Sequence, residues 1–296
     1  MKITLSKYAG FCEGVQRAYE MVEKIASDPT VKRPIFVLGS LVHNIEVVTK
    51  IESLGIKKIE VEGELVEFFK KIKNKVGTLV ITAHGMGPEI YTLAKNYEIA
   101  LVDATCPRVI KVQRLAKNFS DKNFQLVLIG EKEHKEVVGI SQWGGGKAVF
   151  IENKADLKKM HLNPKLPIAV LSQTTQDQEF VQFAEQEILK KYPEAQILDS
   201  ICLATHERQS EISPLAKNNE VIIVIGDPAS SNSKRLFEIA KRSNKNSYFI
   251  QKAQQLEQEW FSGKKTVAVT AGASTPEWII KEVIAKLNCI KTISLA

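Results

Sequence analysis

Short apolar runs alternate with segments of helical periodicity along the whole 296-residue chain. Aliphatic runs bounded by turn-forming residues predict buried strands, and apolar residues at helical spacing predict amphipathic helices. Strands are predicted at residues 3–5, 35–39, 78–82, 100–103, 125–130, 168–172, 197–199, 220–226 and 266–270. Helices are predicted at residues 14–26, 44–54, 64–73, 88–96, 109–118, 177–191, 233–243, 253–260 and 276–287. This alternation is typical of α/β proteins with mainly parallel sheets.

The predicted elements recur three times at nearly constant spacing. Cys12, Cys106 and Cys202 are 94 and 96 residues apart, and each follows a short strand and precedes a helix. A strand that ends in glycine follows each cysteine by 24 to 27 residues, and the polar end of a third strand follows by 68 to 72. Such periodicity indicates repeated supersecondary units. We therefore predict three related α/β lobes at residues 13–105, 106–200 and 201–288, the third completed by the strand of residues 1–12.

Polar residues follow the predicted strands at matching places in the three lobes. They are His43 and Asn44, His84, the His134-Lys135-Glu136 group, Thr174 and Thr175, the Ser230-Ser231-Asn232 group, and Ser274. In open α/β sheets, ligands bind beyond the carboxyl ends of the strands. A pseudo-threefold arrangement of the lobes is expected to direct these residues and the three cysteines into one central cavity.

Composition and charge narrow the class of protein. Hydrophobic residues make up 44% of the chain and charged residues 25%, as in soluble globular proteins. Basic residues exceed acidic ones by 41 − 34 = 7 but form no cluster, which disfavours nucleic-acid binding. A phosphorylated small molecule or an acidic protein partner fits better. The chain has neither a signal-peptide pattern nor an apolar run long enough to span a membrane, so a cytoplasmic location is expected.

In a reducing cytoplasm, the four cysteines need an explanation other than disulfides. A single cysteine is commonly a small buried hydrophobic residue, and Cys289, which lies outside the repeat, is interpreted in this way. Three cysteines at the same place in three repeats favour a shared set of metal ligands. Their spacing does not distinguish zinc from an iron–sulfur cluster, because both are usually held by close cysteine pairs. Three ligands leave one coordination position open for a substrate.

The polar groups suggest proton transfer and anion binding. Glu136, near a metal and a phosphate, is the best candidate for a proton donor. The segment alone favours a solvated charge run, and the matching position of Glu136 in the repeat is what favours a functional role. Ser230, Ser231 and Asn232 stand at a helix start, where their side chains and the free backbone N–H groups suit an anion. The alternative is an ordinary N-cap, but a cap needs only one such residue.

The remaining polar residues are individually less specific. Ser274 stands before a proline-started helix, so a cap is its main alternative. His43 and His84 each follow an apolar strand, a position from which an imidazole can reach a phosphate. Taken singly, each is also compatible with a purely structural role.

Taken together, these motifs resemble those of the 4-hydroxy-3-methylbut-2-enyl diphosphate reductase family, the last enzymes of the methylerythritol phosphate route to isoprenoids. The match runs in the right order over residues 1–287. The matching motifs are Gly10-Phe11-Cys12-Glu13-Gly14-Val15, Val42-His43-Asn44, Ala83-His84-Gly85, Asp103-Ala104-Thr105-Cys106-Pro107, His134-Lys135-Glu136, Gln173-Thr174-Thr175, Cys202-Leu203-Ala204-Thr205, Ser230-Ser231-Asn232 and Thr270-Ala271-Gly272-Ala273-Ser274.

The resemblance implies a monomer with a [4Fe–4S] cluster held by Cys12, Cys106 and Cys202, which is also found as [3Fe–4S] or absent after oxidation. Two electrons and two protons would remove the allylic hydroxyl, bound to the open iron, and yield isopentenyl diphosphate and dimethylallyl diphosphate. The implied catalytic residues are Glu136, His134 and Thr174. The implied substrate-binding residues are His43, His84, His134, Thr174, Thr175, Ser230, Ser231, Asn232 and Ser274. A flavodoxin or ferredoxin is the implied electron donor.

Two stretches depart from the family's usual pattern. Lys135 stands where the family has proline, and Asp227-Pro228-Ala229 replace residues that commonly include a lysine. The loss of a lysine and the gain of Asp227 predict slightly weaker diphosphate binding, unless Lys135 or Lys234 compensates.

Three other functions are compatible with the same residues. A cluster-dependent hydro-lyase would need no reductant, a phospholigand-binding redox sensor would bind without turnover, and a zinc protein would contain no iron.

Overall fold

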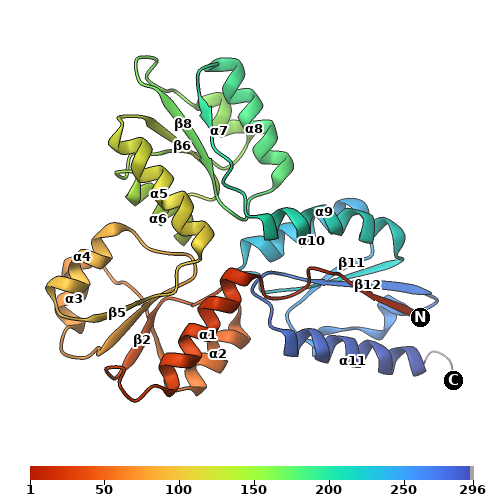
Figure 1. Cartoon of the computed structure of the whole chain (residues 1–296). Coiled ribbons are helices and arrows are strands. Elements are labelled where there is room, and N and C mark those ends of the chain that lie inside the picture. The colour runs from red at the N-terminus through yellow and green to blue at the C-terminus, as the bar shows by residue number, and fades with distance from the viewer. Residues whose placement is uncertain (294–296) are drawn as a thin grey trace. The chain divides into compact units, whose positions relative to one another are not determined.

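The computed structural model describes residues 1–293, in which three four-stranded sheets are each flanked by helices (Figure 1). Every strand pairing in this described part of the chain is parallel. The predicted fold class, three α/β lobes with mainly parallel sheets, is therefore confirmed.

The first sheet has strands in the order β3, β2, β4, β5. Their bounds are Lys57–Ile59, Ile35–Leu38, Thr78–Ile81 and Ala100–Asp103. Helices α3 (Leu65–Ile72) and α4 (Pro88–Asn96) pack on one face, and α1 (Glu13–Ser27) lies on the other (Figure 1). Phe69, fully buried on α3, packs against Leu79 and Ile81 in the core of this face. Helix α2 (Ile45–Ser53) follows β2.

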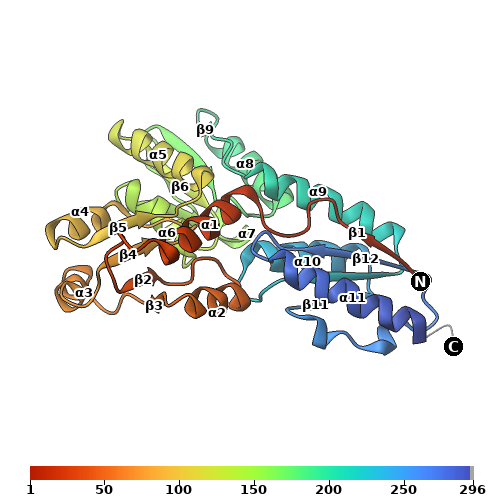
Figure 2. The same cartoon turned by 60° about the horizontal axis from the view of Figure 1, so that its bottom comes forward.

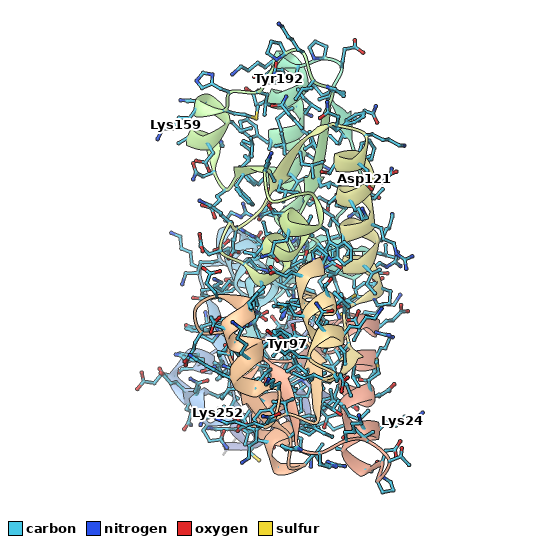
Figure 3. The ribbon with its side chains drawn as sticks, turned by 90° about the vertical axis from the view of Figure 1, so that its left-hand side faces the viewer. Lys24, Tyr97, Asp121, Lys159, Tyr192 and Lys252 are labelled. Carbon is cyan, nitrogen blue, oxygen red and sulfur yellow. The ribbon has the colours of Figure 1, made fainter. Side chains whose placement is uncertain are left out.

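The second sheet repeats this order with β7, β6, β8 and β9. Their bounds are Val149–Ile151, Gln125–Ile129, Ile168–Ser172 and Gln196–Ile197. Helices α5 (Pro107–Asp121) and α6 (Lys135–Trp143) cover one face, whereas α7 (Lys154–Lys159) and α8 (Gln178–Lys191) cover the other. Figure 3 shows the two faces through Asp121 at the end of α5 and Lys159 at the end of α7, which point away from opposite sides of this lobe.

The third sheet has the order β11, β10, β12, β1. The strand bounds are Ser247–Ile250, Val221–Ile225, Thr266–Ala271 and Lys2–Leu5. Helices α9 (Leu203–Asn218) and α10 (Ser231–Ser243) pack on one face, and α11 (Glu277–Ile293) packs on the other. Helices α9 and α11 accordingly lie on opposite sides of β1 and β12 (Figure 1 and Figure 2). The N-terminal strand therefore completes this sheet by pairing with β12.

One edge strand of each sheet, β3, β7 or β11, was not predicted from the sequence. Strands β3, β7 and β11 have only three or four residues, so any apolar run that they contain is too short to predict a strand. The glycine at the end of the neighbouring strand nevertheless bonds to the last residue of each. The N–H groups of Gly39, Gly130 and Gly226 donate to the carbonyls of Ile59, Ile151 and Ile250 at 2.7, 3.0 and 2.9 Å.

The predicted helix over residues 253–260 is wrong. The segment forms two short 3₁₀ turns, Ala253–Gln255 and Gln258–Phe261, separated by extended backbone at Leu256 and Glu257. Ala253, Leu256 and Phe261 are buried against the core of the third lobe. Their apolar spacing resembles that of a helix, but separate turns bring the three side chains onto the sheet.

The described chain divides into two compact units. The first unit contains Met1–Glu13, His43–Val47 and the described chain from Cys202 onward, and the second contains Gly14–Val42 and Val48–Ile201. The third sheet belongs to the first unit, and the other two sheets belong to the second. The lobe boundaries at residues 13–105, 106–200 and 201–288 stay a prediction. Among the described residues, no helix has the length and hydrophobicity needed to cross a bilayer.

Candidate functional site

In the second unit, a buried carboxyl stands at the carboxyl ends of β6 and β8. Glu136, in the first turn of α6, is 2% exposed. The Thr174 N–H, just after β8, donates to Glu136 Oε1 at 2.6 Å, and the Thr174 hydroxyl donates to Oε2 at 3.0 Å. The predicted catalytic residues Glu136 and Thr174 are thus in direct contact.

Burial raises the pKa of Glu136 to about 7, because the charged form loses its hydration. The two hydrogen bonds from Thr174 favour the carboxylate and offset only part of this effect. A carboxyl with such a pKa is divided between its acid and base forms at neutral pH, as a proton donor requires. The alternative of a solvated charge run does not hold for this residue.

His134 precedes Glu136 as the N-cap of α6. Its Nδ1 accepts a hydrogen bond from the Glu136 backbone N–H at 3.2 Å. In the neutral imidazole this arrangement places the proton on Nε2, which can donate to a ligand. The ring of His84, which follows β4, lies 5.5 Å from the His134 ring in an edge-to-face arrangement. The first and second lobes thus each supply one histidine to a common pair.

Gln173 and Thr175 flank Thr174 and stabilise the same loop. The Gln173 side chain accepts a hydrogen bond from the Glu131 N–H at 3.0 Å and donates to the Thr175 hydroxyl at 3.2 Å. Thr175 is thereby fixed beside the loop between β6 and α6. Gln173, which is buried, has the structural role among the three residues.

Cys106 lies at the start of α5, beyond the end of β5. Its N–H donates to the Ala83 carbonyl at 3.0 Å, which joins the cysteine to the loop that carries His84. A Cβ on Gly14 would overlap the Cys106 sulfur, so only glycine leaves room for this thiol. The glycine in the motif around Cys12 thus maintains space at Cys106.

The first unit contains the other two repeated cysteines. Cys12 and Cys202 both carry thiols and are half-buried, and the Cys12 N–H donates to the Ala273 carbonyl at 3.3 Å. Cys202 is the N-cap residue of α9. Cys289, on α11, is exposed rather than buried, unlike the small hydrophobic residue that was predicted.

A buried arginine connects the segments that carry these two cysteines. The Arg208 guanidinium donates to the carbonyls of Gly10 and Ala204 at 2.7 and 2.8 Å. Burial lowers the pKa of Arg208 below its usual range, and the nearby Cys12 and Cys202 offset only part of this effect. Its buried Nε has no hydrogen-bond partner among the described residues. Arg208 therefore offers a positive charge and an unused N–H donor between the segments that carry Cys12 and Cys202, whose thiolates would be negatively charged.

Hydroxyl groups gather at the carboxyl ends of β10 and β12 in the same unit. Ser230, the N-cap of α10, accepts from the Ser233 N–H at 3.3 Å. The Ser274 hydroxyl lies 3.5 Å from the Ser230 hydroxyl and donates to the His43 carbonyl at 3.0 Å. Three of the predicted substrate-binding residues are thus in one connected group.

Ser231 and Asn232 form the first turn of α10 and are buried. In the described structure, neither the oxygen nor the nitrogen of the Asn232 amide has a hydrogen-bond partner. Buried polar groups are normally paired, so such an amide marks a place for a ligand. Its position at a helix N-terminus, where N–H groups and the helix dipole favour anions, indicates an anion.

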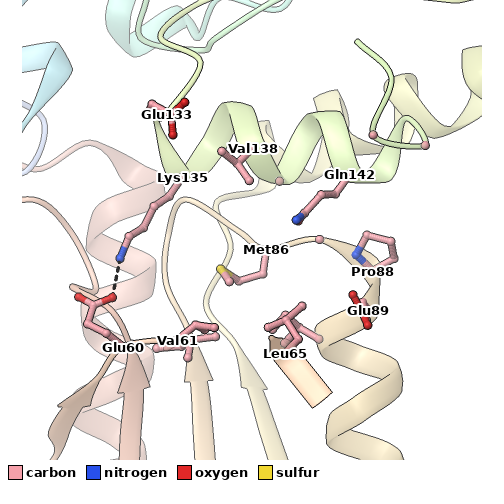
Figure 4. Close-up of a pocket in the computed structure, with 16 residues that line it drawn as sticks. Glu60, Val61, Leu65, Met86, Pro88, Glu89, Glu133, Lys135, Val138 and Gln142 are labelled. Carbon is pink, nitrogen blue, oxygen red and sulfur yellow. Dashed lines mark hydrogen bonds and ion pairs between the residues drawn. The ribbon is translucent and has the colours of Figure 1, made fainter. Parts of the chain in front are cut away.

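Lys135 does not contribute a free positive charge. Its ammonium group binds the carboxylate of Glu60 at 3.1 Å, across a cavity of about 620 Å³ between the first and second lobes (Figure 4). Figure 4 shows Val61, Leu65 and Met86 on the side of this cavity opposite α6. The ion pair is exposed and is expected to contribute little to stability.

The structure thus brings the predicted residues together in separate groups. Glu136 with Thr174 and His84 with His134 lie in the second unit, and the serine, asparagine and His43 group lies in the first. Arg208 was missed in the sequence. The available signal was its position on the buried face of α9, where it shares helical spacing with Thr205 and Ile212.

The fold and these groups define a class: α/β proteins of three parallel-sheet lobes, with thiols, a buried carboxyl and a helix start that carries an unpaired buried amide. Residues 3–288 match the family model described as LytB protein. The chain belongs to this family, as the resemblance of its motifs predicted.

Curated relatives share about a third of their residues with the chain. A 4-hydroxy-3-methylbut-2-enyl diphosphate reductase of Symbiobacterium thermophilum is 35% identical over 280 residues, with 94% of each chain covered. The enzyme of that name from Aquifex aeolicus is 34% identical over 97% of this chain and 96% of its own.

Solved structures of such reductases also match. The Plasmodium falciparum enzyme gives a TM-score of 0.86 at 30% identity, covering 97% of this chain and 87% of that one. A second structure, described as the terminal enzyme of the non-mevalonate pathway, gives a TM-score of 0.69 at 33% identity, covering 97% and 99%.

Proposed function

We propose that this protein reduces 4-hydroxy-3-methylbut-2-enyl diphosphate to isopentenyl diphosphate and dimethylallyl diphosphate. Whole-length similarity to reductases of that name supports the reaction. The observation that carries it in this chain is Glu136, a buried carboxyl whose pKa of about 7 suits it to give protons during catalysis. The reaction consumes two electrons and two protons and releases the allylic hydroxyl as water.

Cys12, Cys106 and Cys202 are proposed to hold a [4Fe–4S] cluster. The donor set fits, because thiolates are the usual ligands of iron–sulfur clusters and all three residues carry thiols. Arg208 supports the fit by offering a buried positive charge and an unused donor near two of them. When bound, such a cluster supplies the electrons, and its iron without a cysteine ligand supplies a Lewis acid.

The diphosphate is proposed to bind at the start of α10. The Asn232 amide, the helix N-terminus and the hydroxyls of Ser230, Ser231 and Ser274 provide donors for its oxygens. His43, His84 and His134 are proposed to add imidazole donors. The diphosphate takes no part in bond breaking, so its binding energy serves to position the reacting hydroxyl.

Glu136 and Thr174 are proposed to deliver the protons. When Glu136 is protonated, its carboxyl can donate to the Thr174 oxygen, and the Thr174 hydroxyl can then donate onward to the substrate. The Thr174 N–H bond to the other carboxyl oxygen holds Glu136 in place during this exchange. A protonated leaving group departs as water rather than as hydroxide, which lowers the barrier. Thr175 is proposed to line the same side of the substrate.

We propose that the protein acts as a monomer in the cytoplasm and is reduced by a flavodoxin or ferredoxin. A net charge of +7 supports such an electron donor, because both of these electron carriers are typically acidic.

Turnover is expected to decline as the pH rises above about 7. Glu136 must carry a proton to donate it, and its raised pKa places the loss of that proton near neutrality. We expect kcat, measured with an artificial electron donor from pH 6 to 9, to fall about tenfold per pH unit on the alkaline side.

The matched control for this pH profile is Thr174→Val, which removes the hydroxyl donor that stabilises the carboxylate. Its kcat should be lower, and the alkaline fall should shift to higher pH because the carboxyl pKa rises further. A wild-type profile that stays flat to pH 9 would remove Glu136 from the proton-donating role.

Anaerobic reconstitution with iron and sulfide, followed by incubation with substrate and reduced methyl viologen, tests the proposed function. We expect a broad visible absorption of the cluster and formation of both C5 diphosphates. A reconstituted protein that binds the substrate without converting it would instead be a sensor. Zinc in place of iron after purification under anaerobic conditions would contradict the cluster.

A further inference from the structure

Asp227 was expected to weaken diphosphate binding, because it adds a negative charge beside the anion site. Both oxygens of its carboxylate instead accept hydrogen bonds from within the protein. Oδ1 accepts the Ala229 N–H at 2.8 Å, and Oδ2 accepts the Ile45 N–H at 3.0 Å and the Gln251 side-chain amide at 3.2 Å. Asp227 is 9% exposed. Its charge is therefore directed into the protein.

The bond from Ile45 places this carboxylate at the N-terminus of α2. Asn44 caps the same helix, because its side-chain oxygen accepts the N–H groups of Glu46 and Val47 at 3.1 and 3.3 Å. Asp227 and Asn44 together satisfy the first three N–H groups of the helix. The positive end of the helix dipole further offsets the negative charge of Asp227.

These contacts fix the segment that carries His43. The His43 carbonyl accepts the Ser274 hydroxyl at 3.0 Å, and two residues later the Ile45 N–H donates to Asp227. The segment is thus anchored on the third lobe at His43 itself and again at Ile45. All of these residues belong to the first unit, which explains why His43–Val47 groups with that unit rather than with the rest of α2.

We infer that Asp227 is a positioning residue of the proposed diphosphate site, which holds His43 beside Ser230 and Ser274 through the first turn of α2. This inference rests on the proposed function for its substrate. It reverses the sign of the expected effect of Asp227 on affinity: removing the charge weakens binding. No compensating lysine is required, which agrees with the engagement of Lys135 by Glu60.

The test is Asp227→Asn in the reconstituted full-length protein. Asparagine has one accepting oxygen in place of two and no charge, so it cannot accept from both Ala229 and Ile45 and no longer offsets the positive end of the α2 dipole. We therefore expect the His43 segment to loosen. We expect KM for the C5 diphosphate and Kd for inorganic pyrophosphate to rise about tenfold, with kcat changed less than about twofold. Hydrogen exchange of the peptide covering residues 42–48 should become faster.

Glu220→Gln is the matched control. Glu220 also accepts two backbone N–H groups, from Lys265 and Thr266 at 2.5 and 3.1 Å, but at the opposite end of the third sheet. This variant should leave KM, Kd and exchange of residues 42–48 unchanged. Gln251→Ala, which removes one of the three donors to Asp227, provides a milder change and should raise KM by about threefold. It keeps the test decisive if Asp227→Asn does not fold.

Tighter pyrophosphate binding by Asp227→Asn would show that the charge repels the substrate and would overturn the inference. Unchanged exchange at residues 42–48 would overturn it as well. If wild-type protein neither binds nor converts the C5 diphosphate, the proposed function fails. The exchange experiment then still decides whether Asp227 holds the His43 segment.

Discussion

Glu136→Gln reduces turnover by about 10²- to 10⁴-fold, the usual contribution of a positioned acid, while cluster content and substrate affinity stay near wild type. Glutamine is nearly isosteric with glutamate and its oxygen still accepts the Thr174 N–H, but its amide protons are not acidic enough to be transferred. Steady-state kinetics with a viologen donor measures the loss in kcat. Iron analysis and pyrophosphate titration of the same sample measure what is retained.

The control for this variant is Glu131→Gln, a half-buried carboxyl in the same loop that none of the proposed steps uses. Its turnover should remain within about twofold of wild type, as expected for a substitution away from the reacting groups. If Glu136→Gln turns over at the wild-type rate, the protons come from another group, and the relay through Thr174 is wrong.

Cys106→Ser loses the cluster and lowers turnover by more than about a hundredfold. This loss exceeds the usual effect of replacing a residue that only hydrogen-bonds to a metal ligand. A serine hydroxyl is not deprotonated near neutral pH and is a poor ligand for iron in a cluster. The visible absorption of the reconstituted protein and its iron content give the result directly. Gly14→Ala should act in the same direction, because its Cβ overlaps the Cys106 sulfur.

Cys289→Ser separates ligand loss from a general effect of removing a thiol. Cys289 is exposed on α11 and lies outside the repeat, so this variant should keep its iron and its turnover. A full complement of iron in Cys106→Ser would undo the assignment of Cys106 as a ligand. Loss of iron in Cys289→Ser would show that the cluster has been assigned to the wrong cysteines.

The repeat made most of the fold predictable from sequence. Buried central strands such as β10 are continuous aliphatic runs, and the spacing of three cysteines located them in each lobe. The short strands β3, β7 and β11 were not predictable in this way, because strands of three or four residues carry too little apolar signal. Their pairing depends on the finished sheet, in which Gly39, Gly130 and Gly226 donate to their last carbonyls.

The residue types at the site were predictable, but their environments were not. Motifs identified Glu136 and Thr174, whereas the raised pKa of Glu136 depends on burial that follows from packing of the second lobe. Asp227 shows the same limit, and here it reversed the predicted effect. Its charge is visible in the sequence, but the donors that engage it come from Ile45 and Gln251, distant segments whose proximity only the fold reveals.

Electron stoichiometry distinguishes reductive dehydroxylation from the other functions that the cysteines allow. The assay combines reconstituted protein, a limiting amount of the hydroxylated C5 diphosphate and excess reduced methyl viologen in one anaerobic cuvette. It measures the viologen oxidised and the C5 diphosphate products formed. The proposed reaction oxidises two viologen radicals for each molecule of isopentenyl or dimethylallyl diphosphate formed. Conversion of the substrate without oxidation of viologen would contradict a reductase and identify a hydro-lyase.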